Sequence, residues 1–337
     1  MGDSLTLLLG TTKGAFLLAG GRDRRDWTVS GPHCGGWPIN HVVGDPASGT
    51  LWAGGGDAWS GAGIWRSADG GESWTLSLLS RGGSAAWLEQ NPEIAAQVGM
   101  EVPGPAPFDG ELDAIWSLGL AGDTLYAGGK PGRLYRSADG GESWSAVIGL
   151  NEHPERDGWQ PGAPGLTLHT ILASPDDPAR LWVGISAAGV FASEDGGESW
   201  QRRGRRANAP AAPPDHPAAG NAEEIGGCVH NAVRAPGGPA DVLYQQNHHG
   251  VFRSPDGGRS WEDVGDGLPS RFGFPIAVHP RDPGTLWVLP LNGDTQGRYP
   301  PDASAAVWKS TDGGTSWRDV RAGLPQENCY FTVLRQA

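Results

Sequence analysis

Few of the features that mark secreted or membrane proteins are present in this sequence. It has only three cysteines, Cys34, Cys228 and Cys329, an odd number spaced too widely for a disulfide framework. No stretch approaches the roughly 18 uninterrupted apolar residues of a membrane span, and residues 1–10 lack the basic start of a signal peptide. We therefore expect a soluble, cytoplasmic protein with no membrane partner.

Basic residues are also scarce. Lys and Arg number 25 against 38 Asp and Glu, a net charge of −13, which repels phosphate backbones and argues against a nucleic-acid partner. Gly (55) and Pro (28) are abundant enough to border on the composition of disordered chains, yet 16 Trp stand among them. Disordered segments are poor in aromatic residues, so this composition predicts a folded protein dense in turns.

One octapeptide, SxDGGxSW, occurs five times. Each copy follows an apolar segment, an LWAGG-like segment and an IWRS-like segment, so each repeat predicts four short strands with the octapeptide as the turn between the third and fourth. In that turn the Asp side chain accepts hydrogen bonds from backbone N–H groups, the two glycines adopt positive φ, and the Trp anchors the turn on the blade. The copies lie at 67–74, 137–144, 193–200, 254–261 and 310–317.

These octapeptides resemble Asp-boxes, and the chain resembles the Asp-box (BNR-repeat) propellers over nearly its whole length. That group includes sialidases, sortilin-like receptors and photosystem-assembly factors, and the likeness is greatest to bacterial sialidase-like proteins. The resemblance implies a β-propeller, since four-stranded units in series form that fold. It does not imply one activity, because the box is a turn device shared by unrelated functions.

The two ends of the chain complete the blade count. Segments 5–11, 15–18 and 27–30 predict three strands of a first blade, and 330–335 matches the strand that this blade lacks. Pairing the C-terminal strand with the N-terminal blade leaves no open sheet edge. We expect an all-β protein, a single domain over 1–337, with six four-stranded blades; seven blades with a missing tail is the alternative.

Four long insertions are predicted on one face of the propeller, the entry face, where the first strand of each blade begins. The box turns are predicted on the opposite face. Loops longer than a connection requires are often functional, so we expect the functional site on the entry face. The insertions are 81–112, 151–166, 203–227 and 292–304.

Histidines recur where the first strand of a blade begins. Equivalent positions in a ring converge on its axis, and several imidazoles together suit Zn, Cu or non-haem Fe, among which the sequence does not choose. The alternative is a metal-free polar network. Cys228 lies on the same side of its strand as one of them, two residues away. The predicted metal ligands are three histidines at first strands, His41, His169 and His230, and His248, which follows the end of a second strand beside His230.

Other residues of this face are candidates for catalysis and substrate binding. Glu152, His153 and Glu327 precede first strands, where a side chain can act as a base on metal-bound water. Aromatic and polar residues nearby are expected to line a small-molecule pocket. They are Trp116, Trp159, Gln245, Asn247, His249, Arg271, Phe274 and Phe331.

These features predict a metal-dependent enzyme acting on a small molecule, hydrolytic with Zn and oxidative with Cu or Fe. Two alternatives remain: a metal-free glycan-active hydrolase of the BNR kind, and a binding or assembly propeller without chemistry. A sialidase is disfavoured, because the resemblance would require three substrate-gripping arginines, a Tyr–Glu nucleophile pair and an early RIP-type motif, and the sequence contains no such motif.

Overall fold

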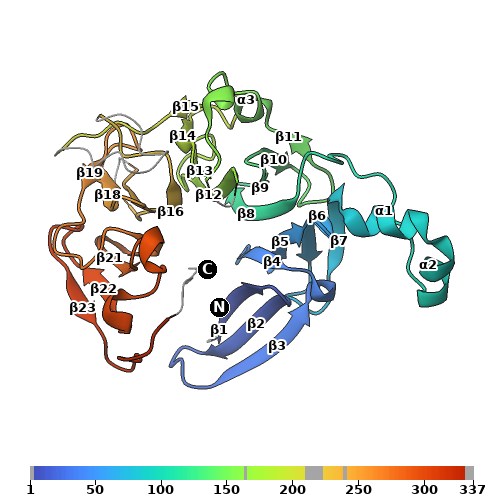
Figure 1. Ribbon diagram of the computed structural model, residues 1–337, viewed down its shortest axis with the longest axis horizontal. Coiled ribbons are helices and arrows are strands. Elements are labelled where there is room, and N and C mark those ends of the chain that lie inside the picture. Colours follow the sequence, from blue (N-terminus) through green and yellow to red (C-terminus); the bar gives the residue numbers. More distant parts are fainter. Residues whose placement is uncertain (1–3, 163–164, 209–222, 238–240, 331–337) are drawn as a thin grey trace. The chain divides into compact units, whose positions relative to one another are not determined.

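A computed structural model of the protein describes residues 4–162, 165–208, 223–237 and 241–330. The described residues form six antiparallel sheets in which each strand pairs with the next along the chain (Figure 1). The chain divides into two compact units, Met1–Asn151 and Glu152–Gln336, and each unit contains three sheets.

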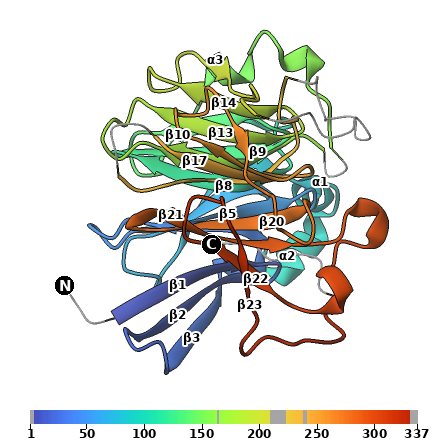
Figure 2. The same cartoon turned by 90° about the vertical axis from the view of Figure 1, so that its left-hand side faces the viewer.

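In the first unit, residues 4–151 form eleven strands and three α-helices, and Figure 2 shows the first three strands side by side. Its sheets are β1 (Ser4–Thr11), β2 (Gly14–Gly21) and β3 (Trp27–His33); β4 (Ile39–Gly44), β5 (Leu51–Asp57), β6 (Gly61–Ser67) and β7 (Thr75–Arg81); and β8 (Ala114–Ala121), β9 (Thr124–Lys130), β10 (Leu134–Ser137) and β11 (Ser145–Ala146). Its helices are η1 (Cys34–Gly36), α1 (Gly83–Gln90), α2 (Pro92–Val98) and α3 (Ile148–Asn151).

The described residues of the second unit form twelve strands. Its sheets are β12 (Thr167–Ala173), β13 (Leu181–Ser186), β14 (Gly189–Ser193) and β15 (Gln201–Arg202); β16 (Val229–Arg234), β17 (Leu243–Asn247), β18 (Val251–Ser254) and β19 (Glu262–Asp263); and β20 (Gly273–His279), β21 (Asp282–Pro290), β22 (Val307–Ser310) and β23 (Arg318–Val320). Its short helical turns are η2 (Arg156–Gly158), η3 (Asp294–Gln296) and η4 (Pro301–Ala303).

The predicted fold class is confirmed: an all-β, six-bladed propeller with four-stranded antiparallel blades and few helices. The first blade shows three strands among the described residues. The strand predicted to complete it, 330–335, lies outside the described residues from Phe331 onward, so closure by that strand stays a prediction. In the described part of the chain, the helices are all too short or too polar to cross a membrane.

The five octapeptides form the predicted turns between the third and fourth strands. In the fourth blade, Asp195 accepts the Ser199 N–H at 2.9 Å and the Ser199 hydroxyl at 2.5 Å, and Ser193 donates to the same carboxylate at 2.7 Å. These hydrogen bonds, the Ser199 hydroxyl foremost, lower the pKa of Asp195 to about 2. Gly196 and Gly197 take φ values of 74° and 95°, which a side chain would strain.

Tryptophans of the second strands tie neighbouring blades together. Within the first unit, Trp52 donates from Nε1 to the Gly140 carbonyl at 2.7 Å, and within the second unit Trp182 donates to Gly257 at 2.8 Å. Both acceptors are the first glycine of the next blade's octapeptide. The tryptophan of an LWAGG or LWVGI segment therefore donates a hydrogen bond to the octapeptide turn of the next blade.

Apolar side chains fill the spaces between adjacent sheets. In the second unit, Trp182 and Val190 from one sheet pack with Val229, Phe252 and Trp261 from the next. Small residues allow this close approach: a Cβ at Gly184 would lie 2.8 Å from a methyl carbon of Val229. The glycines of the repeat thus serve packing as well as turns.

Candidate functional site

The fifth blade has the predicted arrangement of its two ends. Val229, at the start of β16, pairs with Asn247 at the end of β17, whereas Leu243, at the start of β17, pairs with Ser254 at the beginning of the octapeptide. The segment before β16 and the turn after β17 therefore lie at one end of the blade, and the box turn lies at the other.

In several blades the first strand contains a β-bulge, that is, one residue that the pairing with the second strand skips. The residue skipped by the pairing is Trp116 in β8, His169 in β12 and His230 in β16. In β4 it is Asn40, so His41 lies one residue beyond the position that histidine occupies in β12 and β16, and its predicted equivalence to His169 and His230 is wrong. Pairing sets the position of the bulge, and histidine spacing alone could not locate it.

Asn40 and His41 both make hydrogen bonds to the neighbouring blade of the first unit. Asn40 donates from Nδ2 to the Ile115 carbonyl at 2.9 Å, and His41 Nδ1 accepts the Leu118 N–H at 2.9 Å. A lone pair of His41 is thus used within the fold. Its role as a metal ligand stays a prediction.

Two histidines and two phenylalanines gather in the second unit. The His230 ring lies 4.5 Å from the His248 ring and stacks on Phe274 at 4.5 Å with a 21° angle. Phe272, which is buried, meets both imidazoles edge to face at 5.1 and 5.0 Å. We call His230, His248, Phe272 and Phe274 the imidazole cluster.

The surroundings of His230 favour its neutral form. Burial lowers the pKa of His230 well below its ordinary value, and the nearby His248 acts in the same direction. The hydrogen bond to the Gly273 carbonyl opposes this shift, while His169 and Arg298 add smaller contributions that lower the pKa. His169 and Arg298 therefore lie within electrostatic range of the cluster.

Cys228 adds a thiol to the cluster. Its Sγ and one ring nitrogen each of His230 and His248 all lie within 4.8 Å of one another. The Cys228 thiol is buried and lies 3.8 Å from the Ser186 hydroxyl. Two of the four predicted metal ligands, His230 and His248, are thus brought together, with a cysteine beside them.

The predicted catalytic residues lie in different surroundings. His153 is buried; its Nε2 lies 3.2 Å from the Trp200 carbonyl and its Nδ1 accepts the Glu155 N–H at 3.1 Å. Glu152 and Glu327 are exposed. Catalytic roles for these three residues stay predictions.

The two tryptophans predicted to line a pocket differ in burial. Trp159 is buried against His153 and Phe191, with the Arg156 guanidinium 5.1 Å from its ring centre. Trp116, in the first unit, is half-buried. Trp159 therefore packs inside the second unit.

Polar residues predicted to bind substrate are partly used by the fold. Asn247 is fully buried, donates to the Ile225 carbonyl at 2.8 Å and accepts the His249 N–H at 2.7 Å. Arg271 pairs with Asp263 and with Asp266. His249 is half-buried, 6.3 Å from the His248 ring, and Phe331 lies outside the described residues.

Gln245 and Gln246 are adjacent buried residues of β17 whose side-chain amides differ in their hydrogen bonds. In the part of the chain that the structure describes, the Gln245 amide has no partner for either its oxygen or its nitrogen, although the residue is fully buried. The Gln246 amide donates to the carbonyls of Asn247, Gly250 and Arg271 at 2.9–3.0 Å. We therefore expect an apolar side chain to have opposite effects on stability at the two positions.

We expect Gln245→Met to stabilise the protein and Gln246→Met to destabilise it. Removing an amide without partners relieves its desolvation cost, raising the free energy of unfolding by about 1–2 kcal/mol. Gln246→Met removes an amide whose two N–H hydrogens serve three carbonyls, so it lowers that free energy by a similar or larger amount. Urea denaturation measures both, and a Gln245→Met protein less stable than wild type would contradict the assignment.

An exposed tryptophan pair in the first unit was not predicted from the sequence. Trp59 stands in the turn between β5 and β6, Trp87 lies on α1 in the 81–112 insertion, and they are 58% and 40% exposed. Their ring centres lie 6.5 Å apart with a 52° angle. Nothing in the sequence separates these two from the other tryptophans. We call Trp59 and Trp87 the tryptophan platform.

The backbone beneath the platform is firmly held. Asp57 accepts the N–H groups of Trp59 and Ser60 at 3.0 and 2.7 Å, and the Trp59 carbonyl accepts the Ser84 N–H at 2.9 Å. A Cβ at Gly82 would lie 2.4 Å from that carbonyl, so glycine is required where the helix meets the turn. The backbone that carries the Trp59 ring is therefore fixed against the start of α1.

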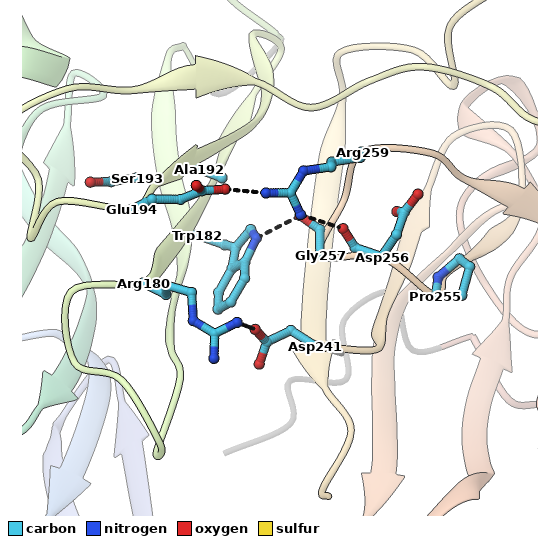
Figure 3. A pocket seen from close by; sticks show the side chains of 10 residues that line it. All are labelled: Arg180, Trp182, Ala192, Ser193, Glu194, Asp241, Pro255, Asp256, Gly257 and Arg259. Carbon is cyan, nitrogen blue, oxygen red and sulfur yellow. Dashed lines mark hydrogen bonds and ion pairs between the residues drawn. The ribbon is translucent and has the colours of Figure 1, made fainter. Parts of the chain in front are cut away.

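A cavity of about 380 Å³ in the second unit lies beside the octapeptide of the fifth blade (Figure 3). Trp182 lines it, and two ion pairs, Arg180 with Asp241 and Arg259 with Glu194, lie on its walls. Asp256 also lines the cavity, so its walls carry three carboxylates and two guanidinium groups and have a net negative charge.

The chain is similar in sequence to curated glycan-degrading enzymes. It is 25% identical over 226 residues to an oligoxyloglucan-reducing end-specific xyloglucanase of Emericella nidulans, and 28% identical over 198 residues to a xyloglucanase of Acetivibrio thermocellus. These matches cover 59% and 56% of this chain but only 26% and 22% of the relatives. The chain thus spans about a quarter of the length of the curated relatives it matches. No protein-family model matches the chain.

Solved structures share the fold. A GH74 xyloglucanase from Xanthomonas campestris aligns with a TM-score of 0.60 at 16% identity, covering 94% of this chain and 43% of that one. A putative 6-phosphogluconolactonase from Bacteroides fragilis aligns with a TM-score of 0.54 at 12% identity, covering 96% and 83%. Proteins named for different activities therefore share this architecture, and the function has to be argued from particular sites.

Proposed function

We propose that this protein is a glycan-active propeller that holds an oligosaccharide on the tryptophan platform. The exposure and spacing of Trp59 and Trp87 carry the proposal. The names of the curated relatives support the same class of ligand, and they favour the metal-free glycan alternative over a metal-dependent enzyme of small molecules.

The platform suits a sugar chain for a physical reason. One face of a pyranose ring with equatorial hydroxyls carries only C–H groups, so stacking it on an indole removes apolar surface from water while the hydroxyls stay solvated. Two rings held 6.5 Å apart contact neighbouring parts of one extended chain. Because the backbone is fixed, binding costs little further conformational entropy.

The experiment is a titration of the full chain with xyloglucan oligosaccharides, using α-linked maltooligosaccharides as the comparison. We expect Trp59→Ala and Trp87→Ala each to weaken binding about tenfold, a loss of about 1.4 kcal/mol of binding free energy, since exposed tryptophans at binding surfaces often dominate the affinity. Isothermal titration calorimetry measures the change. Tyr330→Ala, which removes an aromatic side chain 62% exposed in the second unit, is the matched control.

Wild-type protein that binds none of these glycans would overturn the proposal, as would a Trp59→Ala/Trp87→Ala double variant with unchanged affinity. Hydrolysis is the second candidate function, favoured by the enzyme names of the curated relatives. It is measured in the same samples as the release of reducing ends from xyloglucan.

A further inference from the structure

We propose that Cys228, His230 and His248 form a binding site for Zn²⁺ in the second unit. This site is separate from the tryptophan platform and does not rest on the glycan proposal. It follows from the geometry of three side chains that the pairing of β16 and β17 brings to one end of a blade.

The distances fit a tetrahedral metal with small adjustments. Ligand atoms at about 2.0–2.3 Å from zinc stand about 3.3–3.7 Å from one another. The three atoms offered by Cys228, His230 and His248 already lie within 4.8 Å of each other, so side-chain shifts of about 1 Å bring them into the first coordination sphere. A thiolate with two imidazoles is a donor set that suits Zn²⁺.

The hydrogen bond between His230 and the Gly273 carbonyl selects the tautomer that can bind a metal. Its Nδ1 lies 2.6 Å from the Gly273 carbonyl oxygen, and a carbonyl only accepts, so Nδ1 carries the proton. In the neutral ring the lone pair is then on Nε2, where a metal can bind. A histidine that donates its other N–H to a carbonyl is the usual arrangement of a zinc ligand.

Aromatic side chains hold the two imidazoles in place. Phe272 contacts both rings, and Phe274 stacks on His230. This apolar wall limits rotation of the ligands and lowers the local dielectric constant, which strengthens binding of a cation to a thiolate. Because zinc deprotonates a bound thiol, the Cys228 thiolate would offset one of the two positive charges of the ion.

Three protein ligands leave the fourth position of a tetrahedral zinc open. Catalytic zinc sites keep that position for water or substrate, whereas structural sites fill it with a fourth side chain. Among the described residues only these three offer ligand atoms so close together, so the proposed site leaves this position open to a small molecule with an oxygen, nitrogen or sulfur donor.

The test is zinc binding by the full chain without a histidine tag, stripped of metal with EDTA and titrated against a chromophoric chelator. We expect one tight site, weakened more than about tenfold by Cys228→Ser and by His248→Ala. His279→Ala removes another half-buried histidine of the same unit and should leave the affinity unchanged.

Cobalt substitution provides a readout that does not depend on the variants folding. Wild-type protein with Co²⁺ should show a near-ultraviolet thiolate-to-cobalt charge-transfer band, which a site without a cysteine ligand lacks. Absence of this band, or zinc affinity in wild type no higher than in Cys228→Ser/His248→Ala, would overturn the site. The Trp59→Ala/Trp87→Ala variant should bind zinc normally, so failure here is distinguishable from failure of the glycan proposal.

Discussion

Replacing Asp241 by asparagine is expected to lower the free energy of unfolding by about 3 kcal/mol. The Asp241 carboxylate is buried and joins two arginines: Arg180 Nη1 lies 2.6 Å from one oxygen and Arg234 Nε lies 2.6 Å from the other. Removing the negative charge leaves the buried Arg234 guanidinium with only distant compensation from Asp176, at 3.9 Å. Breaking a buried ion pair by removing one partner is costly, because the other charge remains desolvated.

Two further variants test this explanation. Asp266→Asn removes an almost fully exposed carboxylate that pairs with Arg271 at 2.9 Å, and it should cost less than about 1 kcal/mol because water screens that pair. The Asp241→Leu/Arg234→Met double variant should recover much of the lost stability, since it leaves no uncompensated charge at Arg234. Urea denaturation measures all three. A cost for Asp241→Asn no larger than for Asp266→Asn would contradict the buried-pair explanation.

The repeating parts of the fold could be predicted from the sequence because each is fixed locally. Asp195 and Ser199 bond within one turn, and Gly196 and Gly197 adopt positive φ there, so the octapeptide determines its own conformation. The second-strand tryptophans could be recognised as a pattern, but their partners could not. That Trp182 binds the Gly257 carbonyl depends on how two blades pack.

The candidate sites were less predictable, because they depend on pairing register and exposure. The strand order predicted that His230 and His248 lie at the same end of one blade, and their rings are 4.5 Å apart. The spacing of histidines, however, placed His41 one residue away from the bulge position, which Asn40 occupies. A single skipped residue changes which side chain faces a given direction, and no local signal marks it.

Exposure is a second property that the sequence did not reveal. Trp59 and Trp87 belong to different segments and meet only when α1 docks on the turn between β5 and β6. Trp182, by contrast, is almost fully buried. Tertiary packing therefore decides that Trp59 and Trp87 are exposed and that Trp182 is buried.

Because Trp182 is buried, Trp182→Ala should lower the free energy of unfolding by about 3–5 kcal/mol. Its ring is 4% exposed and packs with Val190, Phe252 and Trp261 between two blades of the second unit. Alanine leaves a cavity that these neighbours fill only in part, and it also removes the bond to the Gly257 carbonyl.

A graded series separates packing from hydrogen bonding at this position. Trp182→Phe keeps most of the apolar contact but loses the 2.8 Å bond to Gly257, so we expect a cost of about 1–2 kcal/mol. Trp59→Ala, which removes an exposed indole, should change stability by less than about 0.5 kcal/mol and also shows that this variant is folded for the binding experiment. If Trp182→Ala costs no more than Trp182→Phe, the hydrogen bond rather than packing holds these two blades together.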